Sequence, residues 1–272
     1  MAAASCHDLV DIGANLAHES FDQDRDEVIA RARAAGVRRL IVTGSTVASS
    51  LAAAALAHRL PGCIYATAGV HPHHATDFGP DAAAALVELA TRSGVVAIGE
   101  CGLDYYRNFS PARAQRLAFE RQLSLAATTG KPVFLHQRDA HEDFVAILAD
   151  QLPRLIGGVA HCFTGPRAQL EQYVGMGLYI GITGWICDDR RGEDLRRAVE
   201  ALPIDRVMLE TDAPYLLPRN LQARTRNRRN EPAHLPAVLE TTARCMGVDP
   251  AVLAAASTAN AELLFGLQST AG

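Results

Sequence analysis

The sequence predicts an α/β fold, a single (β/α)₈ TIM barrel that forms one domain over residues 1–272. Three observations predict it. The length of 272 residues is close to the roughly 250 that are typical of such a barrel. Short β-branched apolar runs recur eight times, and segments with helical spacing separate them. No linker, low-complexity tract or internal sequence repeat divides the chain.

The eight predicted strands are nearly continuous apolar runs that end at glycine, proline or polar residues. Parallel strands covered on both faces need such runs, whereas strands with one wet face alternate. The predicted strands are Leu9–Ile12, Leu40–Thr43, Ile64–Val70, Val95–Ile98, Val133–His136, Val159–His161, Leu178–Ile182 and Val207–Glu210.

Apolar residues spaced three or four apart predict helices between these strands. Val28, Ala32 and Ala35 form one such stripe before Gly36, and the pattern recurs along the chain. An open Rossmann-like sheet is the alternative fold. Against it, the first strand is not followed by the Gly-x-Gly-x-x-Gly segment that a dinucleotide fold needs for its pyrophosphate.

The composition predicts a folded cytoplasmic protein. Hydrophobic residues make up 49% and charged residues 21%, which excludes a disordered composition. The formal net charge of −4 means that any contact with nucleic acid must come from a local basic patch. The six cysteines lack Cys-x-x-Cys spacing, and neither an export signal nor a membrane span is visible. We expect reduced thiols, no membrane partner and no obligate protein partner.

Ionisable side chains collect where the predicted strands end. These residues are Asp11, His71, Glu100, His136, His161, Glu210 and Asp212. The C-terminal ends of barrel strands converge on one face, and charged groups beside apolar strands are costly to bury unless paired or bound to metal. We expect Glu100, His136, His161 and Asp212 to bind a divalent cation, because carboxylates and imidazoles suit zinc, manganese or, less well, magnesium.

Each of these residues has a structural alternative when it is considered alone. His136 could be a hydrogen-bonded imidazole, and Glu100 or Asp212 could form a salt bridge with a buried arginine. Asp11 could equally be a structural acceptor for a loop amide. The convergence of the whole set favours the metal site.

The segment after the last predicted strand is locally basic in an otherwise acidic chain. It contains Arg219, Arg224, Arg226, Arg228 and Arg229. A solvated run without a partner is the alternative, but its position beside the predicted metal site favours contact with a phosphate backbone. Aromatic residues on predicted loops could stack an unpaired base, although Trp185 could equally pack within its loop. They are Tyr105, Tyr106, Phe109 and Trp185.

Several segments resemble, in the same order, the TatD-like metal-dependent deoxyribonucleases, which have an amidohydrolase-type barrel. They are Asp11–Leu16, Ala68–His73, Ala97–Asp104, Pro132–His136, His161–Gly165, Leu209–Tyr215 and Arg229–Pro232. The resemblance implies a metal-dependent hydrolase with its ion on the four residues already chosen. It implies Asp212 and Glu100 as catalytic residues, with Asp212 the general base. It further implies His71 and Arg138 in phosphate binding, and Arg229 and Asn230 in substrate binding.

The chain departs from many of these relatives on its first strand. Gly13 and Asn15 occupy the two histidine positions of an Asp-x-His-x-His motif, as in the subgroup named for TatD itself. Fewer nitrogen ligands favour Mg²⁺, with Mn²⁺ or Zn²⁺ as alternatives, and one or two ions.

The resemblance implies a 3′-to-5′ exodeoxyribonuclease that acts on single-stranded DNA or frayed 3′ ends, with RNA as a further substrate, and a role in DNA degradation or repair. One alternative is a small-molecule amidohydrolase or lactonase, against which the basic segment counts. A non-catalytic nucleic-acid-binding protein is the other alternative, and four intact metal ligands count against it.

Overall fold

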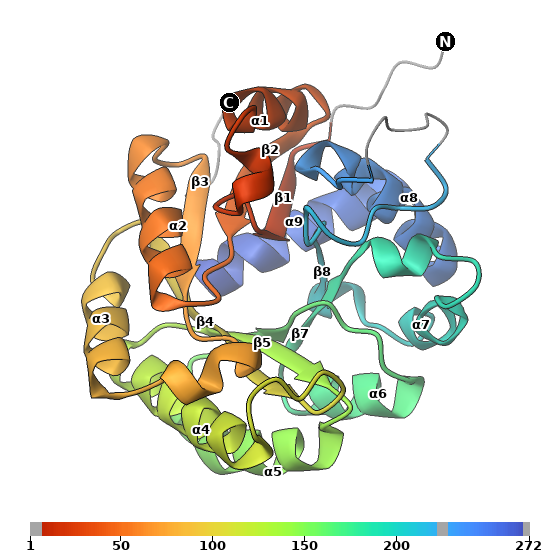
Figure 1. Cartoon of the computed structure of the whole chain (residues 1–272). Coiled ribbons are helices and arrows are strands. Elements are labelled where there is room, and N and C mark those ends of the chain that lie inside the picture. Colours follow the sequence, from red (N-terminus) through yellow and green to blue (C-terminus); the bar gives the residue numbers. More distant parts are fainter. Residues whose placement is uncertain (1–6, 222–227, 269–272) are drawn as a thin grey trace.

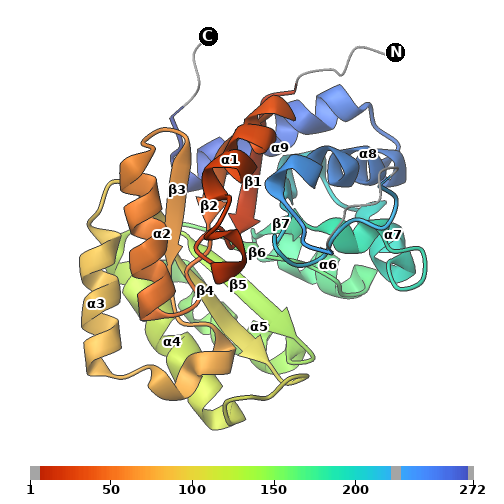
Figure 2. The same ribbon diagram turned by 45° about the horizontal axis from the view of Figure 1, so that its top comes forward.

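A computed structural model describes residues 7–221 and 228–268 of the chain. Eight parallel strands pair in sequence order from β1 to β8, and helices cover the outside of this sheet (Figures 1 and 2). The predicted barrel is therefore confirmed. Within the described residues, none of the helices has both the length and the apolar character needed to cross a bilayer.

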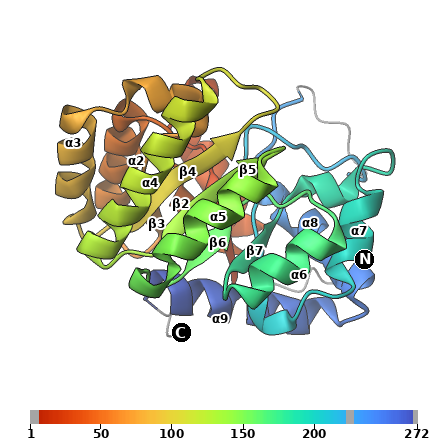
Figure 3. The same cartoon turned by 90° about the horizontal axis from the view of Figure 1, so that it is seen from below.

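The strands are short and fully buried over most of their length. They are β1 (Leu9–Ala14), β2 (Val37–Val42), β3 (Ile64–Ala68), β4 (Val95–Asp104), β5 (Val133–Arg138), β6 (Gly158–Ala160), β7 (Tyr179–Ile182) and β8 (Val207–Leu209). The α-helices are α1 (Arg25–Ala34), α2 (Val47–Arg59), α3 (Pro80–Ala90), α4 (Ala112–Thr129), α5 (His141–Gln151), α6 (Arg167–Gly175), α7 (Glu193–Val199), α8 (Leu235–Met246) and α9 (Pro250–Phe265). Helices α4 and α5 lie side by side over β4 and β5 (Figure 3).

Apolar side chains fill both faces of the sheet. Val10, Ile12 and Phe134 belong to one cluster inside the barrel, whereas Leu9 and Leu40 belong to a larger cluster that includes the helices. This double burial explains why the strands read as continuous apolar runs. The inner cluster also includes residues of α9 and the segment after it, Ala261, Phe265 and Leu267.

Backbone hydrogen bonds connect the end of the first strand to the segment that follows the last strand. The Asp212 amide donates to the Gly13 carbonyl at 2.7 Å, and the Asn15 amide donates to the Ala213 carbonyl at 2.7 Å. These bonds join β1 to the segment after β8. The seam therefore lies beside one of the predicted metal ligands.

Strand β4 is longer than predicted, because its pairing with β5 decides where it ends. The register shifts between Gly99 and Cys101, after which Gly102 pairs with His136 and Asp104 pairs with Arg138. Glu100 therefore lies inside a strand, and the expectation that it ends one is wrong. Gly102 has φ +143, and a Cβ there would collide with the His136 carbonyl, so this close pairing requires glycine.

Candidate metal centre

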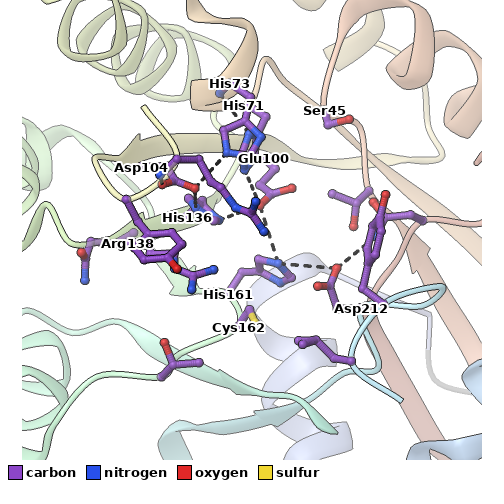
Figure 4. A pocket seen from close by; sticks show the side chains of 18 of the residues that line it. Ser45, His71, His73, Glu100, Asp104, His136, Arg138, His161, Cys162 and Asp212 are labelled. Carbon is purple, nitrogen blue, oxygen red and sulfur yellow. Dashed lines mark hydrogen bonds and ion pairs between the residues drawn. The ribbon is translucent and has the colours of Figure 1, made fainter. Parts of the chain in front are cut away.

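The four expected metal ligands come from separate parts of the barrel. Glu100 lies on β4 and His136 on β5, whereas His161 follows β6 and Asp212 follows β8. All four line one cavity of about 680 Å³, and their side chains point into it (Figure 4). The structure thus brings together residues that are up to 112 positions apart, as the geometry of strand ends predicts.

One carboxylate oxygen of Glu100 lies close to the rings of three histidines. Its Oε1 lies 3.0 Å from His136 Nδ1, 3.4 Å from His71 Nε2 and 3.7 Å from His161 Nε2. Asp212 Oδ1 lies 4.0 Å from the same nitrogen of His161. A carboxylate and three imidazoles that converge at these distances can surround a divalent cation.

The potential donors form two groups. His71, Glu100 and His136 form one, and His161, Cys162 and Asp212 form the other, with the donor atoms of each group within 4.8 Å of one another. His71 therefore lies among the potential ligands, whereas the family resemblance gave it a phosphate contact. Nitrogen and oxygen donors in this number fit a transition-metal ion or Mg²⁺, and two groups leave room for two ions.

The charges of the site depend strongly on burial. Burial alone would raise the pKa of Glu100, but the nearby rings of His71, His136 and His161 outweigh it and lower that pKa. Burial raises the pKa of Asp212 to about 7. Burial also lowers the pKa of His71 to about 3, which leaves its imidazole neutral and able to donate a lone pair.

His161 is held from behind by Glu210. Its Nδ1 lies 2.5 Å from Glu210 Oε2, and the Cys162 amide donates to Glu210 Oε1 at 2.6 Å. Burial would lower the pKa of His161, but Glu210 and then Glu100 raise it to about 10. A carboxylate behind a metal-binding imidazole fixes the ring orientation and increases its basicity. Glu210 was expected at a strand end from the sequence, but no role was predicted for it.

The two departures from the Asp-x-His-x-His motif have structural consequences here. A Cβ on Gly13 would collide with Glu210 Oε2, so glycine makes room for the buried carboxylate that holds His161. The Asn15 side-chain amide donates to Asp212 Oδ1 at 3.0 Å. Both positions therefore support residues that are expected to bind the metal, although neither supplies an imidazole.

Asp104 is a site residue that the sequence reasoning missed. Its Oδ2 lies 2.9 Å from His73 Nε2 and 3.3 Å from His136 Nε2, so it contacts the ring of His136 on the side away from Glu100. The signal was present, because residues four apart on a strand face the same side. Glu100 and Asp104 have that spacing on β4.

Arg138 and Tyr106 form part of the cavity wall. The guanidinium carbon of Arg138 lies 4.0 Å from the centre of the Tyr106 ring. Within the described part of the chain this guanidinium forms no hydrogen bond or ion pair, which leaves its donors available to an anion. Trp185 also lines the cavity, and Phe109 is 68% exposed and packs on His73. These positions suit base stacking.

Arg229 and Asn230 form contacts with other parts of the protein. Arg229 forms two hydrogen bonds to Asp24, at 2.8 and 2.6 Å, and one to Glu231 at 2.9 Å. Asn230 is buried and donates to the Thr211 carbonyl at 2.9 Å. Neither is among the described residues that line the cavity. Asn230 therefore holds the backbone next to Asp212, and Arg229 joins Asp24 to Glu231. The expected substrate contact of these two residues stays a prediction.

The basic segment is also less available than its composition suggests. Arg219 pairs with Asp188 at 3.1 Å, and Arg229 is neutralised as above. Arg228 is exposed. Arg224 and Arg226 lie outside the described residues. Tyr105 donates its hydroxyl to Asp143 at 2.6 Å and lies in a neighbouring cavity.

A parallel barrel that gathers histidines and carboxylates at the C-terminal ends of its strands defines a class of metal-dependent hydrolases. Solved structures with the same fold include a lactonase from Listeria monocytogenes, with a TM-score of 0.61 and 13% identity over 98% of this chain and 97% of that one. The chain belongs to the TatD related DNase family, which matches residues 10–266. The resemblance inferred from the motifs is therefore confirmed.

Relatives similar to the whole chain carry a more specific description. A protein of Citrobacter rodentium is 52% identical over 259 residues, which is 95% of this chain and 98% of that protein. A protein of Klebsiella pneumoniae is 50% identical over the same shares. Each is described as a 3′-5′ ssDNA/RNA exonuclease TatD. A solved TatD homologue from Escherichia coli has a TM-score of 0.88 at 27% identity, over 97% of this chain and 100% of that one.

Proposed function

We propose that this protein is a metal-dependent 3′-to-5′ exonuclease that removes nucleotides from single-stranded DNA and RNA. The observation that carries the proposal is the convergence of three imidazoles on Glu100 Oε1 inside a cavity that is also lined by Arg138, whose guanidinium has no ion-pair partner among the described residues. The relatives at about half identity, described as 3′-5′ ssDNA/RNA exonucleases, support the polarity and the substrate class.

Glu100, His136, His161 and Asp212 are the proposed metal ligands, and the distances add His71 to them. Once bound there, a divalent cation supplies charge neutralisation at a phosphate oxygen and a more acidic water. Mg²⁺ is the proposed ion, because two carboxylates supply the oxygen ligands that it prefers. Three imidazoles also suit Mn²⁺ and Zn²⁺, so these two ions belong in every activity assay.

Asp212 is the proposed general base. The Asn15 side-chain amide donates to one of its carboxylate oxygens at 3.0 Å, and Asp212 lies beside His161 in the cavity (Figure 4). In the proposed reaction, water attacks the phosphorus, its proton passes to Asp212, and the P–O3′ bond breaks. The leaving O3′ takes a proton from solvent, so that the strand ends in a 3′-hydroxyl and the released nucleotide keeps its 5′-phosphate. Loss of such a base slows a reaction by about 10²–10⁴-fold.

Arg138 is the proposed phosphate-binding residue. Its guanidinium is stacked on Tyr106 and unpaired within the described residues, so it can donate two hydrogen bonds to a non-bridging oxygen pair. Contact through phosphates is insensitive to base sequence, which an exonuclease requires.

The test is digestion of one single-stranded oligonucleotide carrying a label at either end. With Mg²⁺, the 5′-labelled strand should give a ladder that shortens with time, and the 3′-labelled strand should release labelled mononucleotide at once. A chelator and the Glu100→Gln substitution should abolish both, whereas Glu88→Gln, an exposed surface change, should not. An RNA strand of the same sequence tests the second substrate.

Two results would contradict this proposal. Binding of the strand without cleavage at any concentration of Mg²⁺, Mn²⁺ or Zn²⁺ would indicate a nucleic-acid-binding protein. Hydrolysis of simple lactones without cleavage of nucleic acid would indicate a small-molecule hydrolase on the same barrel.

A further inference from the structure

A second cavity adjoins the one that holds the candidate metal centre. It has a volume of about 640 Å³ and lies between the loops that follow β4, β5 and β6. The two cavities share four wall residues, Tyr106, Gln137, Arg138 and Thr164. A strand that passes the shared wall would therefore have consecutive nucleotides in the two cavities.

The shared wall carries a cation that can bind a phosphate. Arg138 stacks on Tyr106, with 4.0 Å between its guanidinium carbon and the ring centre, and is unpaired within the described residues. Tyr106 is 58% exposed despite this contact. A phosphate at Arg138 would leave the sugar and base on its 5′ side free to enter the second cavity.

The interior of the second cavity is polar, and apart from Arg138 in the shared wall its charged side chains are the carboxylates Asp139, Glu142 and Asp143. Asp143 is neutralised by Arg116 at 3.1 Å, and both ring nitrogens of His141 have partners, Tyr173 and Gln172. These contacts leave a fixed wall with little attraction for a second phosphate. The wall therefore suits an uncharged nucleoside better than an anion.

Several polar side chains on the other walls lack partners. Within the described residues, three side chains that line the cavity form no hydrogen bonds. They are Glu142 on α5, Gln169 on α6, and Thr164 in the loop before α6. A carboxylate, a hydroxyl and an amide offer both donors and acceptors, which the edges of bases and a ribose hydroxyl can use. The mixture has no preference for one base.

We propose that the second cavity binds the sugar and base of the penultimate nucleotide while the 3′-terminal nucleotide lies at the metal centre. This inference rests on the proposed exonuclease function. It makes the second cavity a subsite for one further nucleoside of any sequence, with Arg138 binding a phosphate between the two cavities.

The test uses short single strands in which one nucleotide is replaced by an abasic sugar, and it measures kcat/KM for release of the first nucleotide. In the wild type, an abasic penultimate position should lower kcat/KM by about tenfold, as expected for loss of one bound base. An abasic position one nucleotide further from the 3′ end should have a smaller effect.

Two substitutions block the cavity from different walls. Gln169→Trp and Glu142→Trp should each slow the unmodified strand by about tenfold, the cost of one bound base, and should remove the additional penalty of the abasic penultimate position. The matched control is Ala168→Trp, which places the same side chain on an exposed position of α6 outside both cavities. Ala168→Trp should keep the full decrease in kcat/KM that the abasic penultimate position causes in the wild type.

The proposal is overturned if the wild type tolerates an abasic penultimate nucleotide without loss, a result that needs no variant. It is also overturned if blocking variants, shown by circular dichroism to be folded, keep the wild-type penalty. Failure of the proposed function looks different, because the wild type would then release no nucleotide from any strand.

Discussion

Asp11 binds Thr211 across the seam of the barrel, although the two residues are 200 positions apart in the chain. Asp11 Oδ1 accepts from the Thr211 amide at 3.0 Å, and Oδ2 accepts from the Thr211 hydroxyl at 2.5 Å. Asp11 also accepts from the Gly13 amide at 3.2 Å. One buried carboxylate thus joins β1 to the residue next to Asp212, and the structural alternative considered for Asp11 describes its contacts.

Replacing Asp11 should destabilise the barrel. The Asp11→Asn side chain has one acceptor oxygen, whereas the donors of Thr211 and Gly13 use both carboxylate oxygens of Asp11. The free energy of unfolding should therefore fall by about 1–3 kcal/mol. Urea denaturation measures this. The control Thr211→Val removes the hydroxyl, which donates to Asp11 and accepts from the Ala213 amide at 3.3 Å, but keeps the backbone contact. It should cost about 1–2 kcal/mol, because a typical hydrogen bond contributes about 1 kcal/mol. Equal stability of Asp11→Asn and the wild type would show that the carboxylate does not hold the seam.

Replacing Glu210 should weaken metal binding while the ligands remain. The Glu210→Gln side chain has one acceptor oxygen, so it can no longer hold both the His161 ring and the Cys162 amide. Loss of such a supporting group typically lowers metal affinity about 10–100-fold. Titration with Mn²⁺, followed calorimetrically, measures the affinity. Glu240→Gln on the exposed face of α8 is the matched control, and equal affinity for the two variants would contradict the prediction.

A divalent cation should stabilise the folded protein. The site holds two carboxylates with three imidazoles, so an ion that binds only the folded state adds about 2.7 kcal/mol at 100 times its dissociation constant. The Tm should rise when Mn²⁺ or Mg²⁺ replaces a chelator, and Glu100→Gln should lose most of this shift. A shift that survives in Glu100→Gln would place the ion elsewhere.

The stability contributed by Asp24 should depend on acid pH. The two hydrogen bonds from Arg229, and after them the one from Arg31, lower the pKa of Asp24 to about 2, against its ordinary value of 3.8. Because the folded-state pKa is the lower one, the stabilisation is fully present above about pH 5 and disappears as the pH falls towards 2. Allowing for solvent screening, Asp24→Asn should cost about 1 kcal/mol at neutral pH.

Urea midpoints of the wild type and Asp24→Asn, measured from pH 7 down to pH 3, test this dependence. The gap between the two proteins should be constant down to about pH 5 and should narrow below it, because the Asp24 carboxyl of the unfolded wild-type chain, with its ordinary pKa of 3.8, starts to bind protons there. A gap that stays constant at all pH values would assign the cost to lost packing.

Arg138 should affect nucleic-acid binding more than turnover. Arg138→Ala removes a guanidinium that has no ion pair in the described part of the chain, so KM for a single strand should rise by about tenfold, while the dependence of log(kcat/KM) on log salt falls by about one unit. Arg138→Lys keeps the charge and should restore the salt dependence without the stacking on Tyr106. Arg206→Ala, which removes an arginine immediately before β8, is the control. An unchanged salt dependence in Arg138→Ala would exclude a phosphate contact.

Strand positions could be predicted because burial on both faces of the sheet requires consecutive apolar residues. Val10 and Ile12 face the inside of the barrel and Leu9 packs outside, so the run is apolar throughout. Strand ends were less predictable. The extension of β4 to Asp104 depends on its pairing with β5, and this interaction joins segments that are about thirty residues apart.

The sequence by itself determined the barrel, the family and a set of polar residues that the closed sheet brings to one face. This was possible because alternating strands and helices leave few topologies, and parallel strands all end at the same face. Only the tertiary structure decided which groups touch. In the folded protein His71 contacts Glu100, Glu210 forms a hydrogen bond with His161, and the guanidinium of Arg229 pairs with Asp24. Hydrogen bonds and ion pairs act over a few ångströms between residues far apart in the chain, so composition and spacing do not reveal their partners.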